Sequence, residues 1–479
     1  MSAIPSLPLD PELCRRACAA RDPRFDGLFF TAVKTTGIFC RPICPARPPR
    51  AGNARYFRTA LAAARVGFRP CRRCRPEAAP GSPAWCGVQT TLSRALRMID
   101  AGEWRDQSAA EFAARLGVGD RYLRALFRRH LGISPLAYAN FRRALLAYRL
   151  LRETTLPVPE VALLAGFGSA RRCTVACTRA LGAGPRQLRS GSGAAADGLK
   201  LLLHYRPPYH WAGIRDFLAA RAVAGLEWVT ATSYGRTFRV AGVRGAFVAE
   251  HCARRHGFAV RLWLERPVPI DAAVARIRAI LDLDADPSAV AERLGRHPLL
   301  AGIAAPGLRL PGVWDPFEAG ARAVLGQQVS VAAGRGLVEE LVARCGTAWR
   351  PQGAPGKLAR LFPEPAAVAR ADLAFLRLPD RRRAALRGLA RHLAAGGGDD
   401  PENWHGIPGI GPWTRDYAAM RLGRPDVLLA SDLGVRRALQ ALRRRFPLAP
   451  PLTAGDCRPW GSYATLQLWH WPASAEETN

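Results

Sequence analysis

The sequence has almost no lysine and comparatively few acidic residues. Lys occurs only at positions 34, 200 and 357, whereas Lys and Arg together number 70 and Asp and Glu together number 38. Arginine therefore carries nearly all of a formal net charge of +32 at pH 7. A genome rich in G and C explains Arg in place of Lys, but it does not explain this excess of cations. A polyanionic partner does explain it, and DNA, double-stranded or not, or RNA is the first candidate.

Two further absences exclude whole classes of protein. No apolar run reaches the ~18 residues that a membrane-spanning helix needs, so no membrane partner is expected. Residues 1–10 lack a basic segment followed by an apolar core, so we expect no signal peptide there and a cytoplasmic protein. The 12 cysteines are spread over 479 residues, unlike those of a small disulfide scaffold. We expect them to bind metal or to stay reduced.

The length of 479 residues and the 49% of hydrophobic residues predict several domains with real cores. Segments rich in Gly, Pro and Ser suggest boundaries near residues 80–83 and 190–198. The expected fold class is multidomain, mainly α with α+β parts. Helical spacing runs through 85–190, whereas 201–203, 228–230, 237–240 and 259–264 resemble strands; from residue 270 the helical period returns. The expected domains are 1–80, 85–190, 199–285 and 286–479.

Two close cysteine pairs are the strongest local signal. Cys40 and Cys44 are separated by three residues, and Cys71 and Cys74 by two. Four thiolates at such spacing suit a tetrahedral Zn²⁺ ion. A purely structural zinc ion, or another soft metal, fits the same spacing.

The sequence around these cysteines resembles that of a known protein family. Segments 26–29, 35–42 and 67–74 closely resemble the N-terminal domain of the Ada family of methyl-response regulators, over about residues 12–78. The resemblance implies an α/β domain with one zinc ion, in which Cys40 is both a ligand and the acceptor of a methyl group from a DNA methylphosphotriester. The transfer is irreversible in that family. Phosphate-backbone contacts are implied for Thr36, Arg47 and Arg73.

A helix-turn-helix follows. Ser108 and Glu111 form a capping box that opens one helix, and residues 117–120 form a turn before the next. On the second helix Arg121 and Arg124 are three residues apart and share one face, as in a recognition helix that enters the major groove. A solvated basic face is the alternative for one such helix alone.

A second copy about fifty residues later weakens that alternative. Residues 160–165 form a helix, and Ser169 caps a second helix that carries Arg171 and Arg172. Residues 88–189 resemble the AraC-type DNA-binding domain, with its repeated ending at 126–135 and 181–185. The resemblance implies an all-α doubled helix-turn-helix that regulates transcription, with RNA polymerase as a partner. We expect a monomer. Cys173 and Cys177 stand where that family has bulky aromatic residues.

A glycine turn lies in the last segment. In residues 407–414, Gly409 and Gly411 would expose backbone N–H groups to a phosphate without sequence preference. Asp432 follows 21 residues after Gly411, behind an apolar run. Taken alone, this carboxylate could simply cap a helix.

Together these features resemble the helix-hairpin-helix glycosylases, and residues 199–472 resemble the AlkA-type 3-methyladenine-DNA glycosylases. Segments 205–211, 217–223, 307–312, 323–330 and 460–464 carry the match. The resemblance implies an α+β subdomain, an all-α helix-hairpin-helix domain, base flipping, catalysis by Asp432 and no cofactor. The implied aromatic pocket residues are Trp413, Tyr417 and Trp469. Gln328 stands where a relative inserts a leucine wedge into DNA, and Leu433 stands where it has a tyrosine.

Trp413 also occupies the place where glycosylases with lyase activity carry a lysine, which implies a monofunctional enzyme. The sequence thus predicts a DNA alkylation repair and adaptive-response protein with two activities, suicidal methyl transfer to Cys40 and base excision. One alternative is a methylation-switched regulator whose glycosylase half is an inactive DNA clamp. Another is a repair enzyme whose middle segment delivers it to DNA without sequence preference. No Pro-Cys-His-Arg sequence of an O6-methylguanine transferase is present.

Overall fold

A computed structural model describes residues 10–21, 25, 29–58, 60–71, 74, 76, 91–104, 107–154, 156–189, 198–355 and 357–471. The chain divides into two compact units, Met1–Asp197 with Pro267–Ala275, and Gly198–Arg266 with Arg276–Asn479. The boundary segments expected near residues 80–83 and 190–197 lie outside the described ranges. A search of these ranges for a helix that could cross a membrane finds none.

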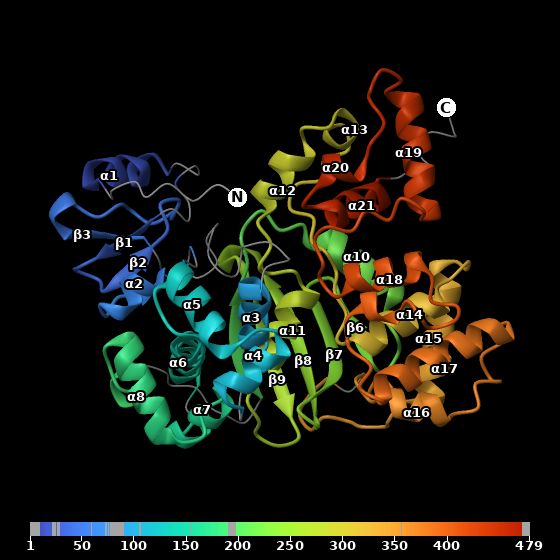
Figure 1. Cartoon of the computed structure of the whole chain (residues 1–479), viewed down its shortest axis with the longest axis horizontal. Helices are drawn as coiled ribbons and strands as arrows, with labels where there is room; N and C mark the ends of the chain where they lie inside the picture. Colours follow the sequence, from blue (N-terminus) through green and yellow to red (C-terminus); the bar gives the residue numbers. More distant parts are fainter. Residues whose placement is uncertain are drawn as a thin grey trace. The chain divides into compact units, whose positions relative to one another are not determined.

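The first unit begins with a small sheet (Figure 1). Its strand order is β3 (Ala54–Phe57), β1 (Phe30–Val33), β2 (Ile38–Cys40) and β4 (Arg69–Pro70). The pair β1–β2 is antiparallel, whereas β2 and β4 run parallel. Helices α1 (Pro11–Ala20) and α2 (Ala60–Arg65) contact this sheet, and η2 (Ala51–Asn53) precedes β3. The parallel pair brings two cysteines to the same end of the sheet, because β2 ends at Cys40 and β4 ends directly before Cys71.

Helices follow in the described part of residues 91–189: α3 (Thr91–Asp100), α4 (Ala109–Arg115), α5 (Asp120–Leu131), α6 (Pro135–Glu153), α7 (Val158–Leu164), α8 (Ala170–Leu181) and α9 (Pro185–Leu188). The long helix α6 contacts α3 and α5 of the first half and α7, α8 and α9 of the second. Ser108 and Glu111 form the predicted capping box. Leu123 and Phe127 of α5 are buried, which leaves the opposite, basic side of the helix exposed.

The second unit contains an antiparallel sheet of order β5 (Leu199–His204), β9 (Gly257–Leu264), β8 (Val243–Cys252), β7 (Ser233–Val240) and β6 (Glu227–Val229). The sequence predicted four of these strands and missed β8. Gly245, Ala246 and Ala249 weaken its strand propensity. Most of β8 is also buried on both faces, so its sequence lacks the alternation that marks a half-exposed strand.

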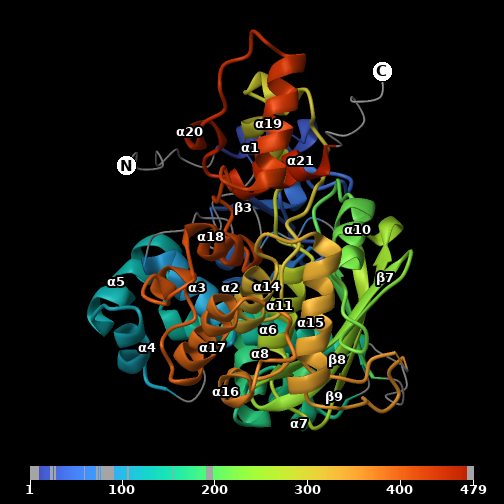
Figure 2. The same cartoon turned by 90° about the vertical axis from the view of Figure 1, so that its right-hand side faces the viewer.

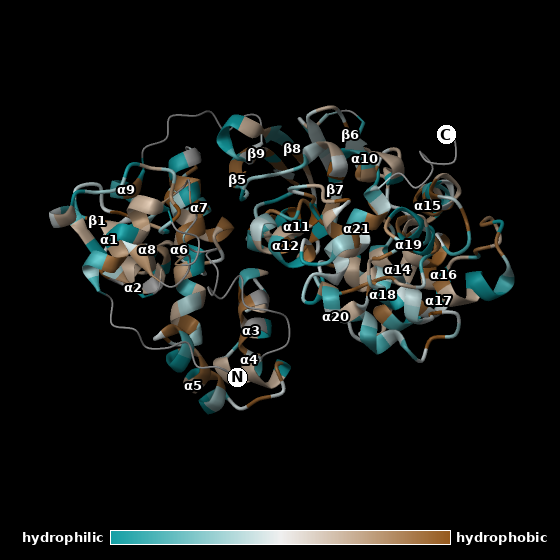
Figure 3. Ribbon diagram, turned by 90° about the horizontal axis from the view of Figure 1, so that it is seen from above, coloured by the Kyte–Doolittle hydropathy of each residue, from teal (hydrophilic) through white to brown (hydrophobic). Residues whose placement is uncertain are grey.

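Helices make up the rest of the second unit: α10 (Trp211–Arg221), α11 (Asp271–Ile280), α12 (Pro287–Leu294), α13 (Pro298–Ala301), α14 (Pro316–Leu325), α15 (Val331–Cys345), α16 (Pro365–Arg370), α17 (Asp380–Ala394), α18 (Pro412–Arg421), α19 (Leu433–Arg445), α20 (Ala454–Cys457) and α21 (Gly461–His470), with η5 (Ala253–Arg255) and η6 (Pro401–Trp404). Helix α11 begins in the stretch assigned to the first unit. Helix α14 is buried along its length among α15, α17 and α18 (Figure 2). Figure 3 shows both hydrophilic and hydrophobic residues along the helices of the unit.

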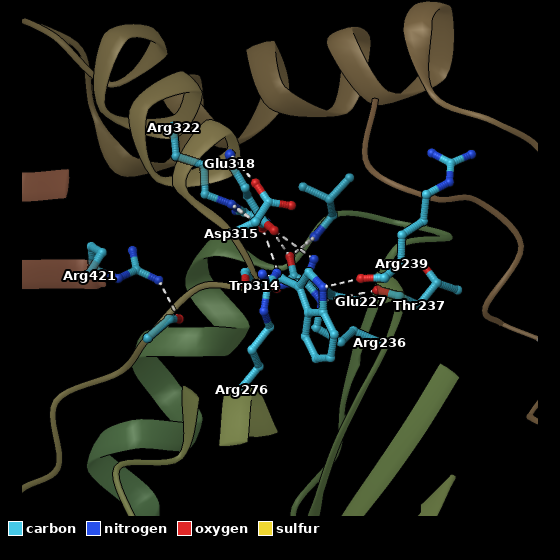
Figure 4. A network of polar contacts seen from close by, with 12 residues as sticks. Glu227, Arg236, Thr237, Arg239, Arg276, Trp314, Asp315, Glu318, Arg322 and Arg421 are labelled. Carbon is cyan, nitrogen blue, oxygen red and sulfur yellow. Dashed lines mark hydrogen bonds and ion pairs between the residues drawn. The ribbon is translucent and has the colours of Figure 1, made fainter. Parts of the chain in front are cut away.

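Buried charges join the sheet of this unit to α14 (Figure 4). Arg236 of β7 donates from Nη1 and Nη2 to the two carboxylate oxygens of Glu318, at 3.2 and 2.7 Å. Arg322 donates from Nε to Glu318 at 2.8 Å and from Nη2 to Glu227 of β6 at 2.6 Å. Glu318 is 0% exposed. Burial raises the pKa of Glu318, but the charges of Arg236 and Arg322 outweigh it and hold that pKa at about 2.

Replacement of Glu318 by Gln should destabilise the second unit by about 3–5 kcal/mol, because it leaves two buried arginines to share the one remaining carboxylate of Glu227. The native pairing stabilises the unit above the ordinary carboxyl pKa of 4.5 and is lost as the pH falls through about 2. Urea unfolding at pH 7 measures the change. Glu292→Gln, which removes an exposed pair with Arg296, is the matched control and should cost at most about 1 kcal/mol. Equal effects of the two substitutions would contradict the prediction.

Candidate functional site

The four predicted zinc ligands come together at one end of the small sheet. Strand pairing places Ile38 opposite Arg69 and Phe39 opposite Pro70, and the Cys71 backbone N–H donates to the Phe39 carbonyl at 2.9 Å. Cys40 and Cys71 therefore leave neighbouring strands side by side. The four Sγ atoms of Cys40, Cys44, Cys71 and Cys74 all lie within 4.8 Å of one another.

This geometry fits a zinc ion. A tetrahedral ZnS₄ centre with Zn–S bonds of ~2.3 Å has sulfurs about 3.8 Å apart, and the Sγ atoms of Cys44 and Cys71 are 3.9 Å apart. The Arg41 backbone N–H also donates to Cys74 Sγ at 3.3 Å, which stabilises negative charge on that sulfur. Cys40 differs from the other three ligands, which are buried, because it is partly exposed. It is the most exposed of the four predicted ligands.

A cavity of about 560 Å³ opens beside Cys40. Thr36 and Arg47, two of the predicted phosphate contacts, line it; the third, Arg73, lies outside the described residues. Tyr148 and Arg152, which were not predicted from the sequence, line the same cavity from α6. Tyr148 accepts a hydrogen bond of 3.3 Å from Arg69, another lining residue.

The predicted recognition helices are α5 and α8. They expose all four predicted DNA contacts: Arg121, Arg124, Arg171 and Arg172. Arg124 donates to Asp120 on its own helix at 2.9 Å, an exposed pair that a phosphate could displace. Cys173 and Cys177 are fully buried on α8, so both side chains belong to the packed side of that helix.

An aspartate and three aromatic rings converge in the second unit. Trp413 and Tyr417 lie one turn apart on α18 with ring centroids 5.3 Å apart, and the Tyr417 ring is 6.3 Å from that of Trp469 on α21. Asp432 accepts hydrogen bonds from both indole N–H groups, at 3.2 Å from Trp413 Nε1 and 2.9 Å from Trp469 Nε1. The two carboxylate oxygens are therefore held within an aromatic site.

Asp432 also caps a helix. Its Oδ1 accepts from the Val435 backbone N–H at 3.1 Å, so it is the N-cap of α19. The capping alternative and the catalytic hypothesis thus concern the same carboxylate, and the cap fixes its direction. The neighbouring Leu433, which replaces a tyrosine of the family, is 53% exposed.

Two arginines that the sequence analysis missed lie behind the rings. Arg421 donates to the Tyr417 hydroxyl at 3.0 Å, and Arg221 lies over the Phe217 ring, 3.7 Å from its centroid. Burial raises the pKa of Tyr417, but the charges of Arg421 and Arg221 outweigh it and lower that pKa to about 8. Arg421 stands one turn after Tyr417, a spacing visible in the sequence; Arg221 comes from α10, which the sequence could not place beside α18.

The predicted DNA-binding turn and wedge lie close to this site. Gly409 has φ +82°, and Gly411 is the N-cap of α18, so the turn leads directly to Trp413. Gln328 is exposed in the loop between α14 and α15 and has a left-handed φ of 55°. Gln327 Nε2 donates to the Gly409 carbonyl at 3.2 Å and to Thr414 Oγ1 at 2.9 Å. Gln327 carries no motif that marks it in the sequence.

Four family models match successive parts of the chain. They are the metal binding domain of Ada over residues 13–77, a helix-turn-helix domain over 112–191, the AlkA N-terminal domain over 200–315 and the HhH-GPD superfamily base excision DNA repair protein over 321–448. The Ada model covers the four-cysteine cluster, and the HhH-GPD model covers Trp413 and Asp432.

Three relatives extend these matches. The "Probable bifunctional transcriptional activator/DNA repair enzyme AlkA" of Mycobacterium tuberculosis is 40% identical over 484 residues, which is 96% of each chain. DNA-3-methyladenine glycosylase 2 of Escherichia coli is 35% identical over 56% of this chain and 96% of its own. The E. coli bifunctional transcriptional activator/DNA repair enzyme Ada is 33% identical over 36% of this chain and 47% of its own.

Proposed function

The chain belongs to the family of bifunctional Ada/AlkA-type transcriptional activators and DNA repair enzymes, and from that premise we propose how its activities divide along the sequence. Residues 1–80 accept a methyl group from DNA, and residues 85–190 read promoter DNA. Residues 199–285 and 286–479 form an α+β subdomain and a helix-hairpin-helix domain that together excise alkylated bases from duplex DNA.

The observation that carries the glycosylase proposal is the Asp432 carboxylate, held by the indole N–H groups of Trp413 and Trp469. A base inside a duplex is inaccessible, so the damaged nucleotide must leave the stack. A base methylated at N3 is cationic, and it would stack on the rings of Trp413, Tyr417 and Trp469.

Asp432 then acts on the sugar. The bond between C1′ and the base nitrogen breaks, and its electron pair leaves with the base, whose positive charge is thereby neutralised. The Asp432 carboxylate stabilises the positive charge that develops on the sugar ring. Water adds to C1′ and loses a proton, which yields an abasic site and free base. This step uses no cofactor.

The enzyme is proposed to be monofunctional. A lyase step requires an amine that forms a Schiff base with the sugar. Trp413 offers none, and the lysines of the chain, at 34, 200 and 357, lie on neither α18 nor α19. The abasic strand should therefore stay intact until alkali cleaves it.

Cys40 is proposed to be the methyl acceptor, with zinc held by Cys40, Cys44, Cys71 and Cys74. When bound, the ion would keep the four sulfurs deprotonated at neutral pH. Cys40 Sγ attacks the methyl carbon of a phosphotriester, and the carbon–oxygen bond breaks with its electron pair on the departing phosphodiester oxygen. A thioether is formed, so each chain reacts once.

Methylation would also change DNA affinity. Four thiolates around Zn²⁺ carry a net charge of −2, which repels phosphate, and methylation of Cys40 reduces it to −1. A methylphosphotriester is neutral, so the negative charge of the unmethylated site does not repel it. Thr36, Arg47 and Arg73 would contact the DNA backbone. The arginines of the two recognition helices would enter the major groove; they are Arg121, Arg124, Arg171 and Arg172.

The chain is proposed to act as a monomer that engages RNA polymerase.

Release of free base from methylated duplex DNA by the full chain tests the proposal. We expect release of 3-methyladenine, with strand cleavage only after alkali. Tight binding of the same DNA without release would favour the inactive clamp. Cleavage before alkali, with a covalent adduct trapped by borohydride, would contradict the monofunctional mechanism. DNA selected from random sequences with methylated and unmethylated chain distinguishes a regulator from a nonspecific delivery module.

A further inference from the structure

We propose that Gln327 is a positioning residue that couples the phosphate-binding turn to the residue inserted into the duplex. The inference rests on the proposed glycosylase function and adds a residue to its machinery. Gln327 itself need not touch DNA. It acts through Gln328 on one side and through the turn at Gly409 on the other.

The hydrogen bonds of Gln327 reach two parts of the site at once. The side-chain amide donates one proton to the Gly409 carbonyl at 3.2 Å and the other to Thr414 Oγ1 at 2.9 Å. Gly409 belongs to the turn proposed to bind a backbone phosphate, and Thr414 follows Trp413 of the proposed base pocket. Thr414 is only 2% exposed, so its position is fixed by packing. The Gln327 amide thus connects the loop that carries Gln328 to the turn at Gly409 and to helix α18.

The loop around Gln327 is held at both ends and in the middle. Helix α14 ends at Leu325, and Ser330 caps α15 by accepting from the Ala333 N–H at 3.2 Å. Between these ends Gln328 has φ 55°, a conformation that costs free energy for a residue other than glycine. Such a conformation persists only where the surroundings hold it, and the bonds of Gln327 are the side-chain contacts that reach this loop from α18 and its turn.

A direct consequence follows for base flipping. When the N–H groups of the turn bind a backbone phosphate, the Gly409 carbonyl takes a fixed position relative to that phosphate. The Gln327 amide follows the carbonyl, and the backbone of Gln328 follows Gln327. The Gln328 side chain is therefore aimed at a defined step of the duplex, at a fixed distance from the phosphate.

The test uses the full chain with Gln327→Met, which keeps the length of the side chain and removes both donors. Thr414→Val removes one acceptor, and the double variant completes a double-mutant cycle. Gln440→Met is the matched control, because Gln440 is exposed on α19. Three quantities are measured: affinity for undamaged duplex, fluorescence of 2-aminopurine beside the lesion as a report of flipping, and single-turnover base release.

Gln327→Met should slow base release about tenfold, the effect expected from two lost hydrogen bonds. The flipping signal should fall in parallel, while the affinity for undamaged DNA changes less than about twofold, because the phosphate contacts remain. Thr414→Val should slow release less, and the double variant should match Gln327→Met, because both remove the same bond. Gln440→Met should behave as the parent chain.

The proposal is overturned if Gln327→Met flips and releases bases as the parent does. It is also overturned if affinity for undamaged DNA falls as much as release, because Gln327 would then be a DNA contact, or if the effects of Gln327→Met and Thr414→Val simply add. A parent chain that flips the nucleotide but releases no base contradicts the proposed glycosylase instead. The flipping signals of the variants then still decide the role of Gln327.

Discussion

Replacement of Asp432 by Asn should slow the release of 3-methyladenine by about 10²–10³-fold. In the proposed mechanism, the carboxylate supplies the negative charge that stabilises the developing positive charge on the sugar, and a neutral amide cannot replace it. The affinity of the chain for methylated duplex DNA should change little, because the phosphate contacts and aromatic stacking remain. Single-turnover release, measured beside equilibrium binding, separates the two quantities.

The geometry around Asp432 makes this substitution unusually clean. Asn is as good an N-cap as Asp, so α19 should keep its start and the stability of the unit should change little. The amide oxygen can still accept from Trp469 Nε1 and the Val435 N–H, which both bond to Oδ1. The amide NH₂ then faces Trp413 Nε1, another donor, so the hydrogen bond to that indole is the one that the substitution removes.

Asp400→Asn is the matched control for Asp432→Asn. Asp400 is also an N-cap, where it accepts from the Glu402 N–H at 3.0 Å, but it lies at η6 and is exposed. The Asp400→Asn variant should release base at the rate of the parent chain. If Asp432→Asn also retained the parental rate, the assignment of Asp432 as the electrostatic stabiliser would be wrong, although the pocket could still bind the base.

The sequence was sufficient where function depends on short spacing. The four cysteines are recognisable from two pairs, and the doubled helix-turn-helix from its caps and turns. The chemistry of Asp432 was ambiguous from sequence, because a carboxylate before a helix is most simply a cap. The structure shows it capping α19 while it accepts hydrogen bonds from Trp413 and Trp469. The two roles are compatible because the cap orients the carboxylate.

The contacts that sequence could not predict join residues far apart in the chain. Gln327 and Thr414 are separated by 87 positions, and Arg69 and Tyr148 by 79. No local pattern marks such partners, because each residue alone resembles an ordinary polar surface residue. Strand β8 was missed for a different reason: burial on both faces removes the alternation on which strand prediction depends.

Methyl transfer should depend completely on Cys40. The parent chain, incubated with DNA that contains methylphosphotriesters, should gain the mass of one methyl group and no more, located on the peptide that contains Cys40. Cys40→Ser should gain none, because an alcohol is far less nucleophilic than a zinc-bound thiolate. Cys252→Ser is the control, since Cys252 is also partly exposed but lies outside the cluster, and it should be methylated as the parent is.

Partial exposure is what makes Cys40 the expected acceptor among four chemically similar ligands. Cys44 and Cys71 also line the cavity of about 560 Å³, but they are buried, as is Cys74, so Cys40 is the most exposed of the four residues to a phosphotriester that enters it. After transfer, the affinity for promoter DNA should rise at least about fivefold at low salt, because one negative charge beside the phosphate backbone is lost. The gain should shrink as salt is added. A methyl group found on Cys44 or Cys71, or an affinity that does not change on methylation, would show that exposure and charge do not control this site.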